Sequence, residues 1–156
     1  MQSFEEYFNN KKEIAQAIYL NQKEVYSPYF KTKVILNSDG FHHLQFSKRK
    51  ERNKKEQIYK FSLLPLGLEV LRKSATIQEY RKLLTPIGSR SERDGFVSMK
   101  EVEYWGMIAI IGENKIKVKT ILRRVGNGKI VFWSVMLYSK RKNGNQKLFT
   151  EGIENE

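Results

Sequence analysis

The chain has 156 residues, a formal net charge of +12 at pH 7, two histidines and no cysteine. The lack of cysteine excludes a disulfide framework and a thiolate metal site. The two histidines are adjacent and would point to opposite faces of a strand, which argues against a histidine-built zinc site. No apolar run reaches the roughly 20 residues of a membrane span, and the polar start is unlike a signal peptide, so we expect a cytoplasmic protein without a membrane partner.

The length fits one domain over residues 1–156, with a helix and connection in about 1–30 and a tail in 150–156. Residues 1–30 hold three Lys/Arg and four Asp/Glu, a balance of −1, so residues 31–156 carry +13. Such an excess makes nucleic acid the first candidate partner and an acidic protein the second.

The first predicted helix covers about residues 3–20. Ser3 and Glu6 form a capping-box pattern, and apolar residues follow at helical spacing. Asn21–Tyr29 is predicted to be a connection. Lys33–Asn37 and Phe41–Ser47 are then predicted to pair as a hairpin, because Asp-Gly between them is a strong turn signal.

The second strand of this hairpin carries His42 and His43. Alternation places His42 on the more apolar face, where it would pack at the edge of the core. His43 shares the more polar face with Gln45 and could transfer a proton near neutral pH. A shift of the register by one residue would exchange the two roles.

Residues 48–60 contain seven Lys/Arg and two Glu, a balance of +5. This run is either a solvated loop leading into a helix or a set of cations that holds a phosphodiester near His43. Glu56–Leu64, Leu66–Lys73 and Thr76–Leu84 are predicted to be helical, and residues 84–96 to form a long loop.

Three consecutive strands are predicted over Met99–Ile111, Lys115–Val125 and Lys129–Tyr138, with glycine-bearing turns between them. One face of this meander would lie under the helices. The other would carry Lys117, Lys119 and Arg123, as an anion-binding surface or as an ordinary solvated face. Glu101 and Glu103 are expected to match cations on the middle strand. Residues 139–146 would form a basic loop, 147–149 a short edge strand and 150–156 an acidic tail.

The expected fold is therefore a single α+β domain, with N-terminal helices and an antiparallel meander covered on one face by helices. The sequence contains no phosphate-binding glycine loop, nucleophile elbow or metal-ligand array. An enzyme on this chain would work without metal or cofactor. RNA cleavage permits this, because the 2′-hydroxyl is an internal nucleophile and catalysis reduces to proton transfer and charge stabilisation.

The sequence places helices before the meander, Arg123-Arg124 at the end of one strand and Phe132-Trp133-Ser134-Val135 in the next. This arrangement resembles the metal-independent ribonucleases of the barnase, EndoU, colicin and RelE group. The similarity covers roughly residues 30–138 and extends to phage-encoded and toxin–antitoxin members. It implies a four-stranded antiparallel sheet after N-terminal helices, and catalysis without metal.

Carried over residue by residue, the resemblance implies a proton-transfer group, a guanidinium on the scissile phosphate and a hydroxyl that binds a phosphate oxygen or orients the sugar. These are His43, Arg123 or Arg124, and Ser134. Arg123 is preferred over Arg124 because it shares the cationic strand face. The nucleic-acid contacts are expected from Lys48, Arg49, Arg52, Lys60, Lys117, Lys119, Tyr104 and Trp133. Tyr104 or Trp133 would stack a base if exposed, although alternation with Ser134 suits Trp133 to the core.

The sequence-based hypothesis is thus a metal-independent endoribonuclease, a hydrolase-type toxin of a toxin–antitoxin module or mobile element, that leaves a cyclic phosphate on RNA. An acidic antitoxin or immunity protein would suit its basic surface. The alternatives are a non-catalytic nucleic-acid-binding protein and a phage-type adaptor.

Overall fold

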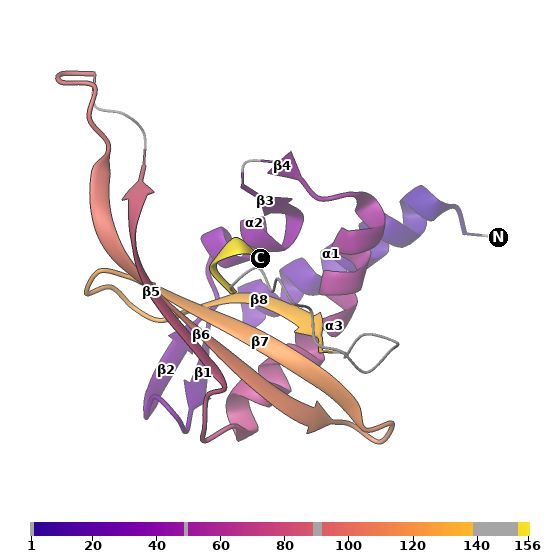
Figure 1. Ribbon diagram of the computed structural model, residues 1–156. Coiled ribbons are helices and arrows are strands. Elements are labelled where there is room, and N and C mark those ends of the chain that lie inside the picture. The colour runs from indigo at the N-terminus through magenta and orange to yellow at the C-terminus, as the bar shows by residue number, and fades with distance from the viewer. Residues whose placement is uncertain (1, 49, 89–91, 139–152) are drawn as a thin grey trace, which may run out of the picture.

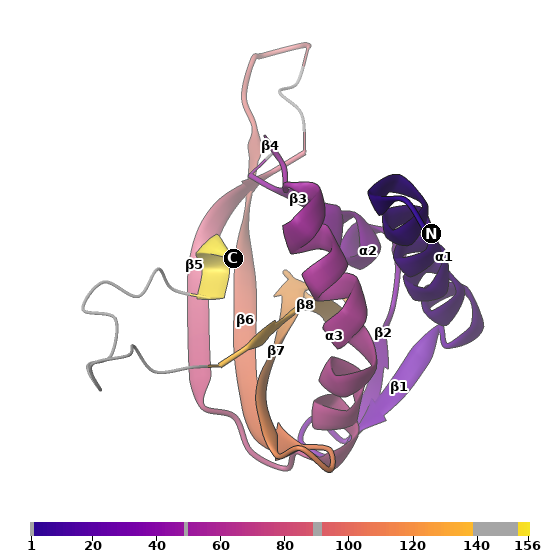
Figure 2. The ribbon, with the colours of Figure 1, turned by 90° about the vertical axis from the view of Figure 1, so that its right-hand side faces the viewer.

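The computed structural model describes residues 2–48, 50–88, 92–138 and 153–156. Within them, three α-helices lie on one face of a six-stranded, mostly antiparallel sheet, so the α+β prediction is confirmed (Figures 1 and 2). The helices are α1 (Phe4–Asn21), α2 (Ser38–Gln45) and α3 (Lys54–Lys73). None of them is long and apolar enough to cross a membrane.

The predicted meander forms the middle of the sheet as β6 (Ser98–Ile111), β7 (Ile116–Val125) and β8 (Val131–Leu137). The order across the sheet is β1-β2-β8-β7-β6-β5. The outer strands are β1 (Glu24–Ser27), β2 (Thr32–Ile35) and β5 (Glu79–Ile87), and only the β2–β8 pair is parallel among the described strands. Positive φ angles at Gly112 (80°) and Gly126 (54°) form the two turns, as predicted.

The predicted hairpin at 33–47 is wrong in its second half, because Ser38–Gln45 is the helix α2. The Asn37 side chain accepts a hydrogen bond from the Gly40 amide at 2.9 Å, which makes it an N-cap. Asp39-Gly40 therefore lies in the first turn of a helix. A Cβ at residue 40 would lie 2.4 Å from the Phe132 carbonyl oxygen, so glycine also lets this helix approach β8 closely. Short strands β3 (Phe46–Ser47) and β4 (Lys50–Glu51) follow it.

Three further predictions of secondary structure are wrong. The connection at 21–29 contains β1, the two helices around Pro65 are one continuous α3, and the helix predicted over Thr76–Leu84 is replaced by β5. Helix α3 continues through the exposed Pro65 because buried leucines before and after it pack on the sheet. Strand β5 is specified by its pairing with β6, from Glu79 opposite Gly106 to Ile87 opposite Ser98.

The main core lies between α3 and the sheet. A Cβ at Gly67 would lie 2.6 Å from Val135 Cγ2, so glycine brings α3 close to β8. Thr120 Oγ1 of β7 donates a hydrogen bond to the Gly67 carbonyl at 2.8 Å, which joins the helix to the middle strand. The large buried side chains of this core include Phe61, Leu64, Leu68, Leu71, Met107, Leu122 and Phe132.

The opposite face of the sheet is not the open cationic surface predicted from the alternation. A second apolar cluster of Val102, Tyr104, Ile121 and Ile153 covers its middle. Ile153 belongs to the short 3₁₀-helix η1 (Ile153–Asn155), which lies beside β5 and β6 (Figure 2). Lys119 is only 9% exposed there and is paired with Glu79, so one of the expected anion-binding cations is neutralised internally.

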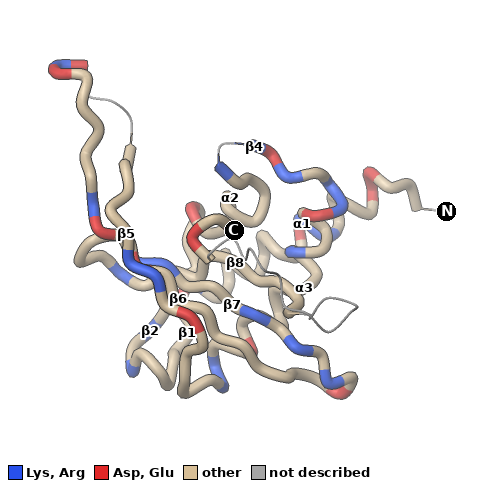
Figure 3. The backbone as a smooth tube through the Cα atoms, in the orientation of Figure 1, with Lys and Arg blue, Asp and Glu red and all other residues tan. Residues whose placement is uncertain are grey.

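Beyond this covered region, β5 and the first part of β6 continue as a two-stranded arm that leaves the body (Figure 1). The predicted loop at 84–96 thus begins as strand, and residues 89–91 lie outside the described residues. The predicted basic loop at 139–146 and edge strand at 147–149 also lie outside them. Cationic residues of the described chain lie on β5, on β7 and around β4 and the start of α3 (Figure 3).

Candidate catalytic and anion-binding site

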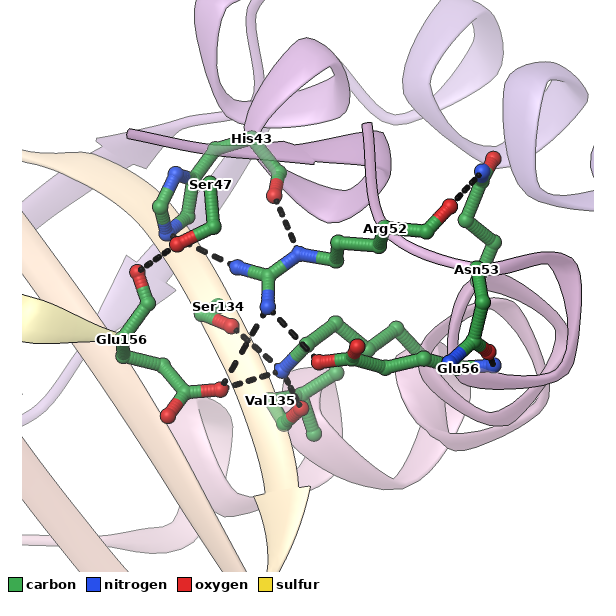
Figure 4. A network of polar contacts seen from close by, with 10 residues as sticks. His43, Ser47, Arg52, Asn53, Glu56, Ser134, Val135 and Glu156 are labelled. Carbon is green, nitrogen blue, oxygen red and sulfur yellow. Dashed lines mark hydrogen bonds and ion pairs between the residues drawn. The ribbon is translucent and has the colours of Figure 1, made fainter. Parts of the chain in front are cut away.

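Side chains from α2, α3, β8 and the junction before α3 form one polar network that contains two carboxylates, those of Glu56 and Glu156 (Figure 4). Four of the residues predicted from the sequence come together here: His43, Arg52, Lys60 and Ser134. They are separated by up to 91 positions in the chain, and the packing of α2 and α3 against β8 brings them together.

Lys60 projects from the middle of α3 into the interior, and its side chain is 1% exposed. Its Nζ donates to Glu156 Oε1 at 2.7 Å, to Ser134 Oγ at 3.0 Å and to the Val135 carbonyl at 3.1 Å. Burial lowers the pKa of Lys60, and the Glu156 carboxylate opposes that shift. The ammonium group therefore has three acceptors, of which only Glu156 is an anion.

Arg52 precedes the N-cap of α3 and joins α2 to α3. Its Nε donates to the His43 carbonyl at 3.1 Å, and its Nη1 donates to Glu56 Oε1 at 2.9 Å. Nη2 lies 3.4 Å from His43 Nε2, and Nη1 lies 4.0 Å from Glu156 Oε1. With a side chain that is 5% exposed, Arg52 is fixed in position by these contacts.

His43 is 9% exposed and stacks on Trp133, with ring centroids 4.2 Å apart. Burial lowers its pKa to about 3, and the positive charges of Arg52, Lys60 and Arg123 act in the same direction. The imidazole is therefore neutral at pH 7, which is the form that accepts a proton.

The predicted faces of the two histidines are exchanged, because residues 38–45 are helical rather than extended. His43 turns inward, whereas His42 is exposed and stacks on Phe46 with ring centroids 4.3 Å apart. The expectation that His43 would share a polar, open face with Gln45 is thus wrong, although the proximity of His43 to cations is confirmed.

Arg123 reaches the same place from β7 through aromatic contacts. Its Cζ lies 4.2 Å from the centroid of the Trp133 ring and 5.7 Å from that of Tyr104. Its Nε is buried and, among the described residues, has no hydrogen-bond partner. His43 and Arg123 both contact Trp133, so the imidazole and the guanidinium meet at one indole ring.

A bulge in β8 explains why Trp133 and Ser134 both contribute to the site. Ile121 is opposite Ser134 and Leu122 is opposite Phe132, so Trp133 is the extra residue. Strict alternation would have placed Trp133 and Ser134 on opposite faces. Arg124, by contrast, points to the other face of β7, where it is bonded to Glu103 and lies over Trp105. The predicted charge match with the middle strand is confirmed for Glu103 and wrong for Glu101, which pairs with Lys82 of β5.

Of the remaining predicted nucleic-acid contacts, Lys119 is paired with Glu79, and its charge helps to lower the pKa of Glu156. Tyr104 is 5% exposed and belongs to the second apolar cluster, so it has no open ring face for a base. Lys48 and Lys117 are exposed, the latter over the Tyr138 ring at 4.8 Å. Arg49 lies outside the described residues.

An open pocket of about 580 Å³ lies beside the cluster. Its lining combines cationic, anionic and amide side chains and consists of Ser47, Lys50, Glu51, Arg52, Asn53, Glu56, Asn155 and Glu156. Sequence reasoning missed Glu56 and Glu156, placing the first in a helix start and the second in a tail. The one available signal for Glu156 was an acidic segment at 151–156 in a strongly basic chain.

The described residues contain no group of three or more His, Asp or Glu that could hold a metal ion. Arg52, Lys60 and Ser134 carry groups of the kind that bind oxyanions, and the His43 imidazole lies 3.4 Å from the Arg52 guanidinium. Comparisons with protein-family models, with curated proteins and with solved structures find no match to this chain.

Proposed function

We propose that the protein is a metal-independent endoribonuclease that holds one phosphodiester of RNA among His43, Arg52, Lys60 and Ser134, with Arg123 beside them. The observation that supports this is one network in which Lys60 contacts Ser134 and Glu156, and Arg52 contacts His43 and lies 4.0 Å from Glu156. A phosphate in place of the Glu156 carboxylate would meet the same two cations. A single buried lysine is often structural, but two cations, a hydroxyl and an imidazole in one network match the needs of phosphoryl transfer.

In the proposed reaction, the neutral His43 accepts the proton of the 2′-hydroxyl, and the 2′-oxygen forms a bond to phosphorus. The bond from phosphorus to the 5′-oxygen breaks, and that oxygen takes a proton. Burial lowers the pKa of Lys60, which makes its ammonium group a suitable donor of that proton. The products are a 2′,3′-cyclic phosphate and a 5′-hydroxyl. Arg52 and Arg123 offset the charge that develops on the phosphate.

A second candidate function is RNA binding without cleavage, and one observation favours it. A pKa of about 3 makes His43 a weak base, and its ring is closed in by Trp133 and Arg52. Such an imidazole could serve packing alone. The exposed cations around β4 and α3 would then bind the RNA backbone non-specifically.

A toxin of a toxin–antitoxin module or a mobile element, acting in the cytoplasm, would need a neutralising partner. An acidic antitoxin fits the net charge of +12 through electrostatic complementarity.

Cleavage of end-labelled RNA by the purified protein in EDTA tests the proposal. We expect fragments with wild-type protein, and loss of cutting in His43→Ala and in Arg123→Ala. His42→Ala is the matched control, since His42 is the exposed neighbour of His43 and should leave cutting unchanged. Circular dichroism verifies that each variant is folded. Tight, salt-sensitive binding of RNA that stays intact would favour the binding protein instead.

A further inference from the structure

We infer that the cluster of Arg52, Lys60, Ser134 and His43 is a binding site for a phosphate-class oxyanion, and that the Glu156 carboxylate occupies it as a tethered competitor. An anion from solution would bind only when Glu156 leaves. This inference deepens the proposed function, since it describes how the same site is kept closed to RNA. It can nevertheless be tested without RNA.

The buried ammonium group of Lys60 needs an anion beside it. An ammonium group whose side chain is 1% exposed is costly to bury unless an opposite charge compensates it. Arg52 has Glu56 as a partner at 2.9 Å, whereas Glu156 is the one anion that contacts Lys60 among the described residues. Without Glu156, the ammonium group would keep only two neutral acceptors, Ser134 Oγ and the Val135 carbonyl.

The hydrogen-bond donors of the cluster suit an oxyanion with several oxygens. Glu156 Oε1 receives a hydrogen bond from Lys60 and lies 4.0 Å from Arg52 Nη1. A tetrahedral phosphate in the same place could accept from the ammonium, the guanidinium and the Ser134 hydroxyl through different oxygens. The carboxylate uses one of its two oxygens for the cations, so it fills the site incompletely.

Glu156 is held less firmly in the fold than Arg52 and Lys60, the two cations that it contacts. Its side chain is 28% exposed, against 5% or less for Arg52 and Lys60. The turn that carries it is held by Ile153 in the second apolar cluster, by a 3.7 Å contact of Glu154 with Arg81 and by a 3.4 Å hydrogen bond from Ser47 to the Glu156 carbonyl. Apart from the 2.7 Å ion pair of Glu156 with Lys60 and a hydrogen bond of its backbone with His43, one buried apolar side chain and long polar contacts hold the turn. These can be released without unfolding the sheet.

An anion from solution can reach the cluster through the neighbouring pocket. The pocket of about 580 Å³ is lined by Glu156 and by Arg52, so an anion that enters it meets the site directly. Lys50 and Asn53 line the same pocket together with the carboxylates of Glu51 and Glu56, so the approach to the site is of mixed charge. Displacement of Glu156 is therefore an exchange of one anion for another at the mouth of an existing opening.

Titration calorimetry with inorganic phosphate tests this inference. We expect the Glu156→Gln protein to bind phosphate at least about tenfold more tightly than wild type, because the tethered competitor is removed. Glu113→Gln is the matched control: it removes the same charge at an exposed turn residue and should bind like wild type. Lys60→Met in the Glu156→Gln background should abolish binding.

Equal phosphate affinities of wild type, Glu156→Gln and Glu113→Gln would overturn the inference, as would phosphate binding that survives Lys60→Met. If Glu156→Gln does not fold, Ile153→Ala gives the same comparison, since it loosens the turn and leaves the site charges in place; unchanged affinity would again overturn it. Phosphate binding without RNA cleavage by any variant would leave this inference standing and remove the ribonuclease. RNA cleavage that is identical in wild type and Glu156→Gln would support the ribonuclease and overturn the inference that Glu156 competes for its site.

Discussion

Acidification from neutral pH should destabilise this protein through His43. The pKa of His43 is lowered from 6.5 to about 3 by burial and by three neighbouring cations. Between those two values the unfolded chain binds a proton on this histidine and the folded chain does not, so stability falls as the pH falls. Linkage gives a loss of about 2 kcal/mol between about pH 7.5 and about pH 5, approaching about 5 kcal/mol near pH 3.

Urea unfolding at these two pH values measures the effect. The choice of about pH 5 limits the contribution of Glu156, whose ordinary pKa is 4.5. Burial raises this pKa, but Lys60, Arg52 and Lys119 together lower it further than burial raises it. His43→Gln, which cannot be protonated, should lose about 2 kcal/mol less than wild type over this interval. His42→Gln should behave like wild type. An equal loss in all three proteins would refute the assignment of a buried, neutral imidazole to His43.

Three other substitutions test the packing that positions the site. Gly67→Ala should destabilise by about 1–2 kcal/mol in urea unfolding despite its better helix propensity, because the new Cβ meets Val135; a more stable protein would contradict that close approach. Thr120→Val should cost about 1 kcal/mol through the lost bond to the Gly67 carbonyl, and no change in the denaturation midpoint would mean that this bond contributes nothing. Ser3→Ala should cost about 1 kcal/mol of helix stability, seen as faster amide exchange in the first turn of α1; unchanged exchange would argue against the capping box.

The meander could be predicted from the sequence because its signals are local. Alternating β-branched and aromatic residues, with glycine at the positive-φ turn positions 112 and 126, specify three strands without reference to the rest of the chain. The capping box of α1 is equally local. These elements were therefore predicted to within a few residues.

The predictions of secondary structure are wrong where contacts between residues far apart in the sequence determine the structure. Asp39-Gly40 is a turn signal by itself, but the Asn37 cap and the close approach of Gly40 to the Phe132 carbonyl make it the start of a helix. Glu79–Ile87 has a sequence compatible with a helix, and its pairing with β6 makes it a strand. Propensity rules carry no information on either contact.

The candidate site was found in its residue types but not in its geometry. Charge and chemistry singled out His43 and Lys60, and the family resemblance singled out Ser134. Their burial, and the role of Glu156, follow from how α3 and η1 pack on the sheet. The bulge that places Trp133 and Ser134 at one site breaks the alternation on which the sequence argument relied.

The most direct test of the account is mass spectrometry of the RNA ends produced in EDTA by the Glu156→Gln protein. The account predicts fragments that carry a 2′,3′-cyclic phosphate and a 5′-hydroxyl, formed faster than with wild type and absent when His43→Ala is added. RNA that remains intact with both wild type and Glu156→Gln, under conditions where both proteins bind it, would contradict the assignment of this cluster as a site of RNA cleavage.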